Sequence, residues 1–249
     1  MAVFGEDALN ALNAESAGGN NNNNFTKFNV GTKLYVKVLG TSDLMMYDNY
    51  GIFGKVNSFV AKSPSKKTPK GFPVENLTPW DKAFKYHNDL SEKWQDEHSN
   101  EANKYKPERR FVLGFYDLTE GDYIVVDLSR NQAKTILNTV HKFEKRLDKM
   151  AFELTKEKTG AENTSVVVSL TPVMFPEEDL TDEQRKNFEE APEEFDKSRF
   201  EGILYEMDED EMIEKLVDVG FDVTKIGFDK PKKDDKEDDK EEGEPEFDF

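Results

Sequence analysis

The stretch RRFVLGFYDLTEGDYIVVDLSRNQAKTILNTVHKFEKRLDKM, residues 109–150, decides the fold that this sequence predicts. Its first half alternates between apolar and polar residues, which is typical of two half-buried strands, at 109–118 and 122–129, joined by the turn TEGD. Ser129 then caps a helix over 129–150, where apolar residues recur every three or four positions. This apolar stripe consists of Ala133, Ile136, Leu137, Val140, Phe143, Leu147 and Met150. A β-hairpin followed by an amphipathic helix is therefore the centre of the predicted domain.

Further strands extend this unit on both sides. TKLYVKVLG (32–40) and GIFGKVNSFVAK (51–62) alternate in the same way, and AFELTKEKTG (151–160) with TSVVVSLTP (164–172) predicts a final strand pair. Five short curved strands with one helix are typical of an OB-fold. We predict a mainly β fold with α-helices, a five-stranded OB-fold barrel at 25–174. Thr78 and Pro79 begin a helical insertion at about 78–105.

The two ends differ from this body in composition. Residues 1–24 end in GGNNNNN, which predicts a flexible arm. Residues 1–170 carry 23 Lys and Arg against 22 Asp and Glu, whereas residues 171–249 carry 11 against 30. We therefore predict an acidic helical extension at 175–228 and a disordered acidic tail at 229–249. Such asymmetry is typical of nucleic-acid contact by the body and an acidic interaction tail.

Several classes of function are disfavoured. The chain has no Cys, which excludes disulfides and thiolate metal ligands, and His87, His98 and His141 lack the spacing of a zinc site. Phosphate-binding loops and Ser/His/Asp sets are also missing, so we expect neither an enzyme nor a cofactor. No segment has the ~20 apolar residues that span a bilayer, and no secretory signal is recognisable. We expect no membrane association and a cytoplasmic location, in the host cell if the protein is phage-encoded.

The outward positions of the predicted strands and the loop KSPSKKTPKGFP (62–73) carry aromatic and basic side chains. Single-stranded nucleic acid needs aromatic faces for base stacking, at ~1–3 kcal/mol each, and cations for its phosphates. The candidate DNA-binding residues are Tyr35, Lys37, Phe53, Lys55, Phe59, Lys62, Lys66, Lys67, Lys70, Trp80, Arg110, Tyr116 and Tyr123.

A packing interpretation competes with this functional one. Aromatic residues in strands usually belong to the core or to cross-strand pairs. Trp80 and Phe84 share one helix face at four-residue spacing, so they could dock the insertion on the barrel, or Trp80 could stack a base. The conjunction of aromatics and cations favours nucleic-acid binding.

Residues 107–172, from PERRFVLGFYDLTEGDYIVVDLS to FELTKEKTG and TSVVVSLTP, resemble the single-stranded DNA-binding, or helix-destabilising, replication proteins of tailed phages. The resemblance implies an OB-fold that coats single-stranded DNA during replication, recombination and repair, with possible self-association on the DNA. Some members hold a structural zinc through Cys and His in the insertion. This chain has no Cys there, so we expect no zinc site in it.

The tail KKDDKEDDKEEGEPEFDF is similar in design to the acidic tails of single-strand-binding proteins. Its acids can occupy the basic groove of the same chain when DNA is absent. Phe247, Asp248 and Phe249 are expected to bind a replication partner, such as a polymerase or a helicase-primase, through an apolar pocket with a basic rim. A tail that merely solubilises the protein is the plainer alternative.

Two other functions remain open. The acidic end suggests a DNA mimic or assembly protein that acts through protein partners, although the mildly basic body argues against it. Asp117, Glu120, Asp122 and Asp127 could form a magnesium-dependent nuclease site, but acids are ordinary around a turn. Sequence-independent binding of single-stranded DNA without catalysis is the leading prediction.

Overall fold

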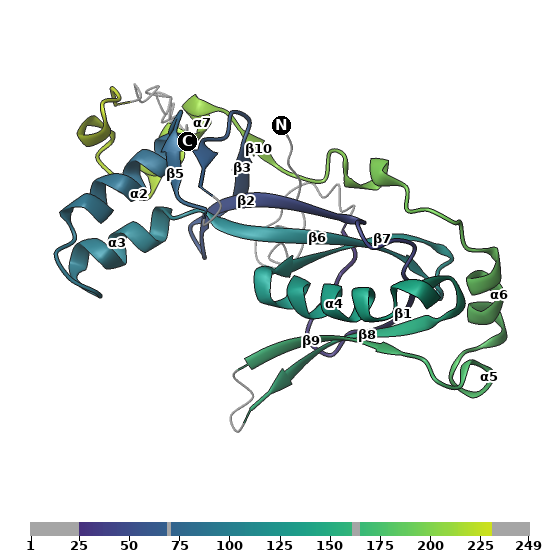
Figure 1. The fold of residues 1–249 in the computed structure, drawn as a ribbon. Helices are drawn as coiled ribbons and strands as arrows, with labels where there is room; N and C mark the ends of the chain where they lie inside the picture. Colours follow the sequence, from purple (N-terminus) through teal and green to yellow (C-terminus); the bar gives the residue numbers. More distant parts are fainter. Residues whose placement is uncertain (1–24, 69–70, 161–164, 231–249) are drawn as a thin grey trace, which may run out of the picture.

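The structure is a computed structural model that describes residues 25–68, 71–160 and 165–230 (Figure 1). Its main sheet runs in the order β10-β3-β2-β6-β1-β8-β9, and β7 pairs with β6 beside this path. All neighbours are antiparallel except β10 and β3. The strands are β1 (Lys33–Lys37), β2 (Leu44–Ile52), β3 (Val56–Ala61), β6 (Glu108–Asp117), β7 (Asp122–Ser129), β8 (Ala151–Thr159), β9 (Ser165–Pro172) and β10 (Glu206–Met207).

Helix α4 (Arg130–Lys142) packs on β6, β7 and β9 and closes the core of the first lobe. Ser129 caps it in a capping box, in which the Gln132 side chain also accepts from the Ser129 N–H at 3.0 Å. The buried Ala133, Ile136 and Val140 meet apolar side chains of the strands, including Val36, Leu113, Val126, Phe152 and Leu170. The predicted hairpin and helix are confirmed, although the helix ends earlier and continues as the 3-10 helix η1 (Glu144–Lys149).

The segment between β1 and β6 forms a second lobe beside the first (Figure 1). It contains β2, β3, the small sheet of β4 (Lys66–Lys67) and β5 (Pro73–Glu75), and the helices α2 (Pro79–Leu90) and α3 (Glu97–Tyr105). Thr78 caps α2 by accepting from the Asp81 N–H at 3.1 Å, as the sequence predicts. Trp80 and Phe59 lie at the centre of this lobe, with ring centroids 5.1 Å apart.

The acidic extension packs along the length of the protein. It contains α5 (Pro176–Asp179), α6 (Asp182–Glu190), the 3-10 helix η2 (Lys197–Phe200), β10, α7 (Glu209–Asp218) and the 3-10 helix η3 (Val223–Ile226). Residues 175–207, here called the strap, run from α6 along the sheet to β10 (Figure 1). Phe195, Phe200, Ile203 and Leu204 anchor the strap in a buried cluster with strand residues. Helix α7 then packs on α2, and the carbonyl oxygen of Met212 accepts from Trp80 Nε1 at 3.1 Å.

The overall class is a mixed α/β fold with a large, mostly antiparallel sheet. Closure of a five-stranded barrel is not confirmed, because β7 and β9 do not pair within the described residues. Strand β2 was missing from the sequence-based prediction, since the run LMMYDNYGI has no clean alternation. In the part of the chain that the structure describes, no helix has the length and apolar character to cross a membrane.

Candidate nucleic-acid interface

A groove of about 410 Å³ lies where the second lobe meets the start of α4. The loop before β5 forms one wall, the segment that links α3 to β6 forms the floor, and the first turn of α4 forms the other wall. The lining residues are Asp48, Gly71, Phe72, Pro73, Phe84, Lys106, Pro107, Glu108, Arg109, Ser129, Arg130 and Asn131. The groove therefore combines apolar surface with three cations and two carboxylates.

Three cations line this groove, and a fourth, Lys67, lies next to it. Lys106 and Arg130 are exposed to solvent. Arg109 Nε donates to Asp48 Oδ1 at 3.0 Å, and the Lys67 ammonium lies 3.3 Å from Asp48 Oδ2. The three lining cations and Lys67 outnumber the two carboxylates, Asp48 and Glu108, so the formal local charge is positive. The N-terminus of α4 adds partial positive charge at the same place.

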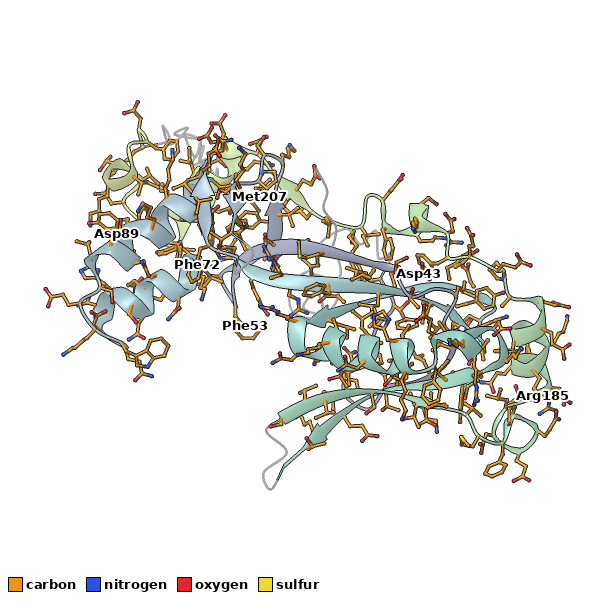
Figure 2. All side chains as sticks on the ribbon, viewed as in Figure 1. Asp43, Phe53, Phe72, Asp89, Arg185 and Met207 are labelled. Atoms are coloured by element: carbon orange, nitrogen blue, oxygen red, sulfur yellow. The ribbon has the colours of Figure 1, made fainter. Side chains whose placement is uncertain are left out.

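Two exposed phenylalanines belong to this side of the second lobe. Phe72 lines the groove and is 48 % exposed, and the Lys106 ammonium lies 5.9 Å from its ring centroid. Phe53 is 94 % exposed and projects from the turn between β2 and β3 near the junction of the lobes (Figure 2). Gly54, with a φ of 71°, shapes that turn, and Lys55 beside it is also exposed. Aromatic faces next to cations are what single-stranded nucleic acid requires.

A buried polar network holds the loop before β5 in place. The Tyr50 hydroxyl donates to Asp81 Oδ2 at 2.9 Å, and the Ser65 hydroxyl donates to the same oxygen. The Lys67 ammonium donates to the Tyr50 hydroxyl at 3.1 Å, and the Thr78 N–H donates to Ser65 Oγ at 2.9 Å. Burial, together with the Asp81 carboxylate, raises the pKa of Tyr50 well above its usual value. The network ties β2, β4 and α2 together, so it fixes the base of the loop that carries Phe72.

The largest group of predicted binding residues lies on the sheet face opposite α4, and the strap covers much of that face. The Lys37 ammonium donates to the Phe188 carbonyl oxygen at 2.9 Å, and burial lowers the pKa of Lys37. Tyr35 is half-buried against the cluster that contains Leu180 and Phe188. These residues do point away from the α4 side as predicted, but α6 rather than solvent meets them.

The remaining residues of that face are also engaged. Tyr116 is 8 % exposed, and its hydroxyl donates to the Gly121 carbonyl oxygen at 2.8 Å. The Tyr123 hydroxyl donates to the Glu194 carbonyl oxygen at 3.3 Å. Arg110 pairs with the buried Asp127. Burial opposes the charge of Arg110, but the Asp127 carboxylate outweighs it and raises the Arg110 pKa. Exposure of this face was predicted wrongly.

Two predicted binding aromatics belong to the core instead. Phe59 and Trp80 are both 0 % exposed, so neither can stack a base. Phe59 was assigned outward by strict alternation, but helices α2 and α7 cover its side of β3, and the strap covers the side that carries Val60. For Trp80 the packing interpretation is the correct one. The insertion docks through this side chain, as the shared face with Phe84 indicated.

The predicted loop lysines have separate environments. Lys62 lies 3.2 Å from Asp208, and Lys66 lies 2.7 Å from Glu75, both as exposed ion pairs. The Lys67 side chain is 5 % exposed behind the groove. Lys70 lies outside the described residues, as do Phe247, Asp248 and Phe249. Phe53 and Lys55 are exposed as predicted.

Sequence reasoning missed Phe72, Lys106, Arg109 and Arg130. The segment KGFP, with an aromatic residue inside a Lys- and Pro-rich loop, is a signal that could have identified Phe72. Two of the four acids proposed for a nuclease form ion pairs: Asp127 pairs with Arg110, and Asp122 pairs with Arg199 at 2.9 Å. Across residues 25–68, 71–160 and 165–230, no group of three or more His, Cys, Asp or Glu could hold a metal ion.

Comparison with known proteins does not assign the chain to a family. No protein-family model matches it, and no curated protein sequence matches it either.

Proposed function

We propose that this chain is a sequence-independent single-stranded DNA-binding protein that coats and protects single strands during phage DNA replication and recombination. The observation that carries the proposal is the groove that Phe72 lines together with Lys106 and Arg130, both of them exposed cations. The exposed Phe53, in the turn between β2 and β3 of the same lobe, adds a second aromatic face. The phenylalanine rings stack bases, and the cations neutralise phosphates without reading the sequence.

The connectivity of the first lobe supports an open OB-type barrel. Strands β1, β6 and β7 are followed by α4 and then by β8 and β9, and β1 pairs with both β6 and β8. In such a barrel the second lobe is an insertion after the first strand. OB-folds bind oligonucleotides with a strand face and its flanking loops. Here the strap covers the strand face, so the inserted loops and the start of α4 supply the binding surface.

The acidic tail completes the proposal. Residues 231–249 carry 4 Lys against 10 Asp and Glu, so they can compete with DNA for the groove. The terminal Phe247, Asp248 and Phe249 recruit a phage or host replication protein. No catalytic step is assigned to the chain.

A competition experiment tests the proposal. Labelled oligo-dT is bound to the full-length protein, and unlabelled single strands or duplexes of equal length are added. The proposal expects single strands of different sequence to compete equally well and duplex to compete poorly. Equal competition by duplex would remove the role of base stacking, and a complete lack of binding would favour the alternative function of an acidic DNA mimic.

A further inference from the structure

Strand β9 forms one end of the main sheet, and its outer edge has no strand partner among the described residues. The other ends of the sheet differ from it. Strand β10 has two residues, and the outer edge of β7 receives a hydrogen bond from the Thr26 N–H to the Val125 carbonyl oxygen at 3.2 Å. Up to its last residue, Pro172, strand β9 therefore presents an edge on which alternate residues direct their backbone groups outward, away from β8.

Before Pro172 at its end, this edge carries none of the devices that usually prevent pairing. Residues 165–171 contain no charged residue and no proline, and β9 pairs with β8 in one continuous register without a bulge. Natural edge strands are normally protected by lysines, prolines or bulges. Val166 and Val167 are 40 % and 42 % exposed. A long, neutral and apolar edge of this kind is typical of a surface that pairs with another strand.

The two faces of β9 determine which partner fits. Val168 and Leu170 pack in the core with α4, so Val166 points to the same side, by alternation, but remains exposed. An apolar residue opposite Val166 on a neighbouring strand would cover it. Strand β9 itself supplies such a residue in antiparallel pairing.

We propose that two copies of this chain dimerise by antiparallel pairing of their β9 strands. A two-fold axis perpendicular to the sheet keeps α4 of both copies on the same side. It sets Val168 opposite its own symmetry mate and Val166 opposite Leu170 of the second copy. The register centred on Val168 pairs residues 165–171 completely with themselves.

The absence of charge from residues 165–171 selects the second copy over other occupants. In a two-fold interface each residue meets the equivalent region of its own sequence, so any charge near the axis would face a like charge. A strongly acidic or basic partner segment would gain nothing from this edge. The inference does not depend on DNA binding, and it gives a specific surface to the self-association expected from the sequence.

Sedimentation velocity of the full-length protein without DNA tests the dimer. We expect a reversible, concentration-dependent dimer for the unchanged chain and for Val166→Thr, which keeps a neutral β-branched side chain. Val166→Glu places a carboxylate opposite Leu170 of the second copy and should raise the dimer dissociation constant by at least about tenfold. Within one copy the new Glu faces Lys158, its partner on β8, so the monomer should keep its fold and melting temperature.

Hydrogen exchange of residues 165–171 gives a second readout. Protection of these amides should rise with protein concentration in the unchanged chain and should be lost in Val166→Glu. A monomer at all concentrations, or a dimer unaffected by Val166→Glu, would overturn the proposal. Strong protection that does not depend on concentration would also overturn it, because residues 1–24 of the same chain would then be the occupant.

Discussion

The ring of Phe195 lies directly on the backbone of Gly114, so closely that a Cβ atom at this position would overlap the ring. Gly114 belongs to the middle of β6, and Phe195 belongs to the strap some eighty residues later. This contact, with the burial of Phe200, Ile203 and Leu204, shows that the acidic strap is an integral part of the fold. It also explains why this strand face is covered by the strap instead of being open to solvent.

Substitution of Gly114 by alanine tests the anchoring of the strap. The added methyl group should displace Phe195 and destabilise the protein by about 1–3 kcal/mol, the usual cost of overpacking a core. Chemical denaturation measures the change. When Phe195 is first replaced by alanine, adding Gly114→Ala should lower the free energy of unfolding much less than it does in the chain that keeps Phe195. Equal costs in the two backgrounds would mean that the strap is not seated on β6.

The cations of the groove should set the salt dependence of DNA binding. For single strands the logarithm of the binding constant falls with a slope of about −0.7 per phosphate neutralised. Lys106→Ala and Arg130→Ala should each weaken oligo-dT binding and make this slope shallower by about 0.7. Lys186→Ala is the matched control, since Lys186 lies on α6 away from the groove and pairs with Glu190. An unchanged slope in both groove variants would place the phosphates elsewhere.

The loop between α2 and α3 should depend on the charge of Asp96. This carboxylate accepts from the Ser99 N–H at 2.6 Å and also from the Lys93 and Glu92 N–H groups, which lower its pKa from 3.8 to about 2. A carboxylate whose pKa is lowered by folding stabilises the folded state fully at pH values above its ordinary pKa of 3.8. That stabilisation is lost as the pH falls through about 2. The Ser99 amide resonance should therefore titrate with a midpoint near pH 2. A midpoint near 3.8 would mean that the capping bonds are absent in solution.

Removal of the acidic tail should strengthen DNA binding. A chain that ends at Lys230 loses a net negative segment that competes with phosphates for the groove. We expect tighter oligo-dT binding by the truncated chain at low salt, and a difference that shrinks as salt screens the tail. Isothermal titration at several salt concentrations measures this. Weaker binding after truncation would show that the tail assists the complex instead of competing with it.

The sequence predicted local structure better than it predicted exposure. The hairpin over 109–129, its helix and the caps at Thr78 and Ser129 follow from local patterns, which is why they agree with the structure. Alternation shows that two faces of a strand differ, but it does not show what covers the polar face. Lys37 and Tyr123 are covered by Phe188 and Glu194, residues far away in the sequence.

The same difference between local pattern and exposure applies to the proposed binding residues. Phe53 was assigned outward by alternation in the predicted strand 51–62, whereas in the structure it is exposed because it lies in the turn between β2 and β3. Arg109 and Arg130 become neighbours of Phe72 only through the docking of the second lobe on the first, which no local pattern encodes. Long-range packing therefore decided which of the many aromatic and basic residues remain available to a ligand.

The central claim is tested most directly by fluorescence anisotropy of labelled oligo-dT with full-length variants. Phe53→Ala and Phe72→Ala should each weaken binding by about 1–3 kcal/mol, or roughly five- to 150-fold. Phe175→Ala is the control, because Phe175 is 64 % exposed but lies on the strap, whereas Phe53 and Phe72 both belong to the second lobe. Weakening in both phenylalanine variants of the second lobe, with the control unchanged, is the predicted result. Affinity equal to that of the unchanged chain in the Phe53→Ala, Phe72→Ala double variant would contradict the assignment of this groove to single-stranded DNA.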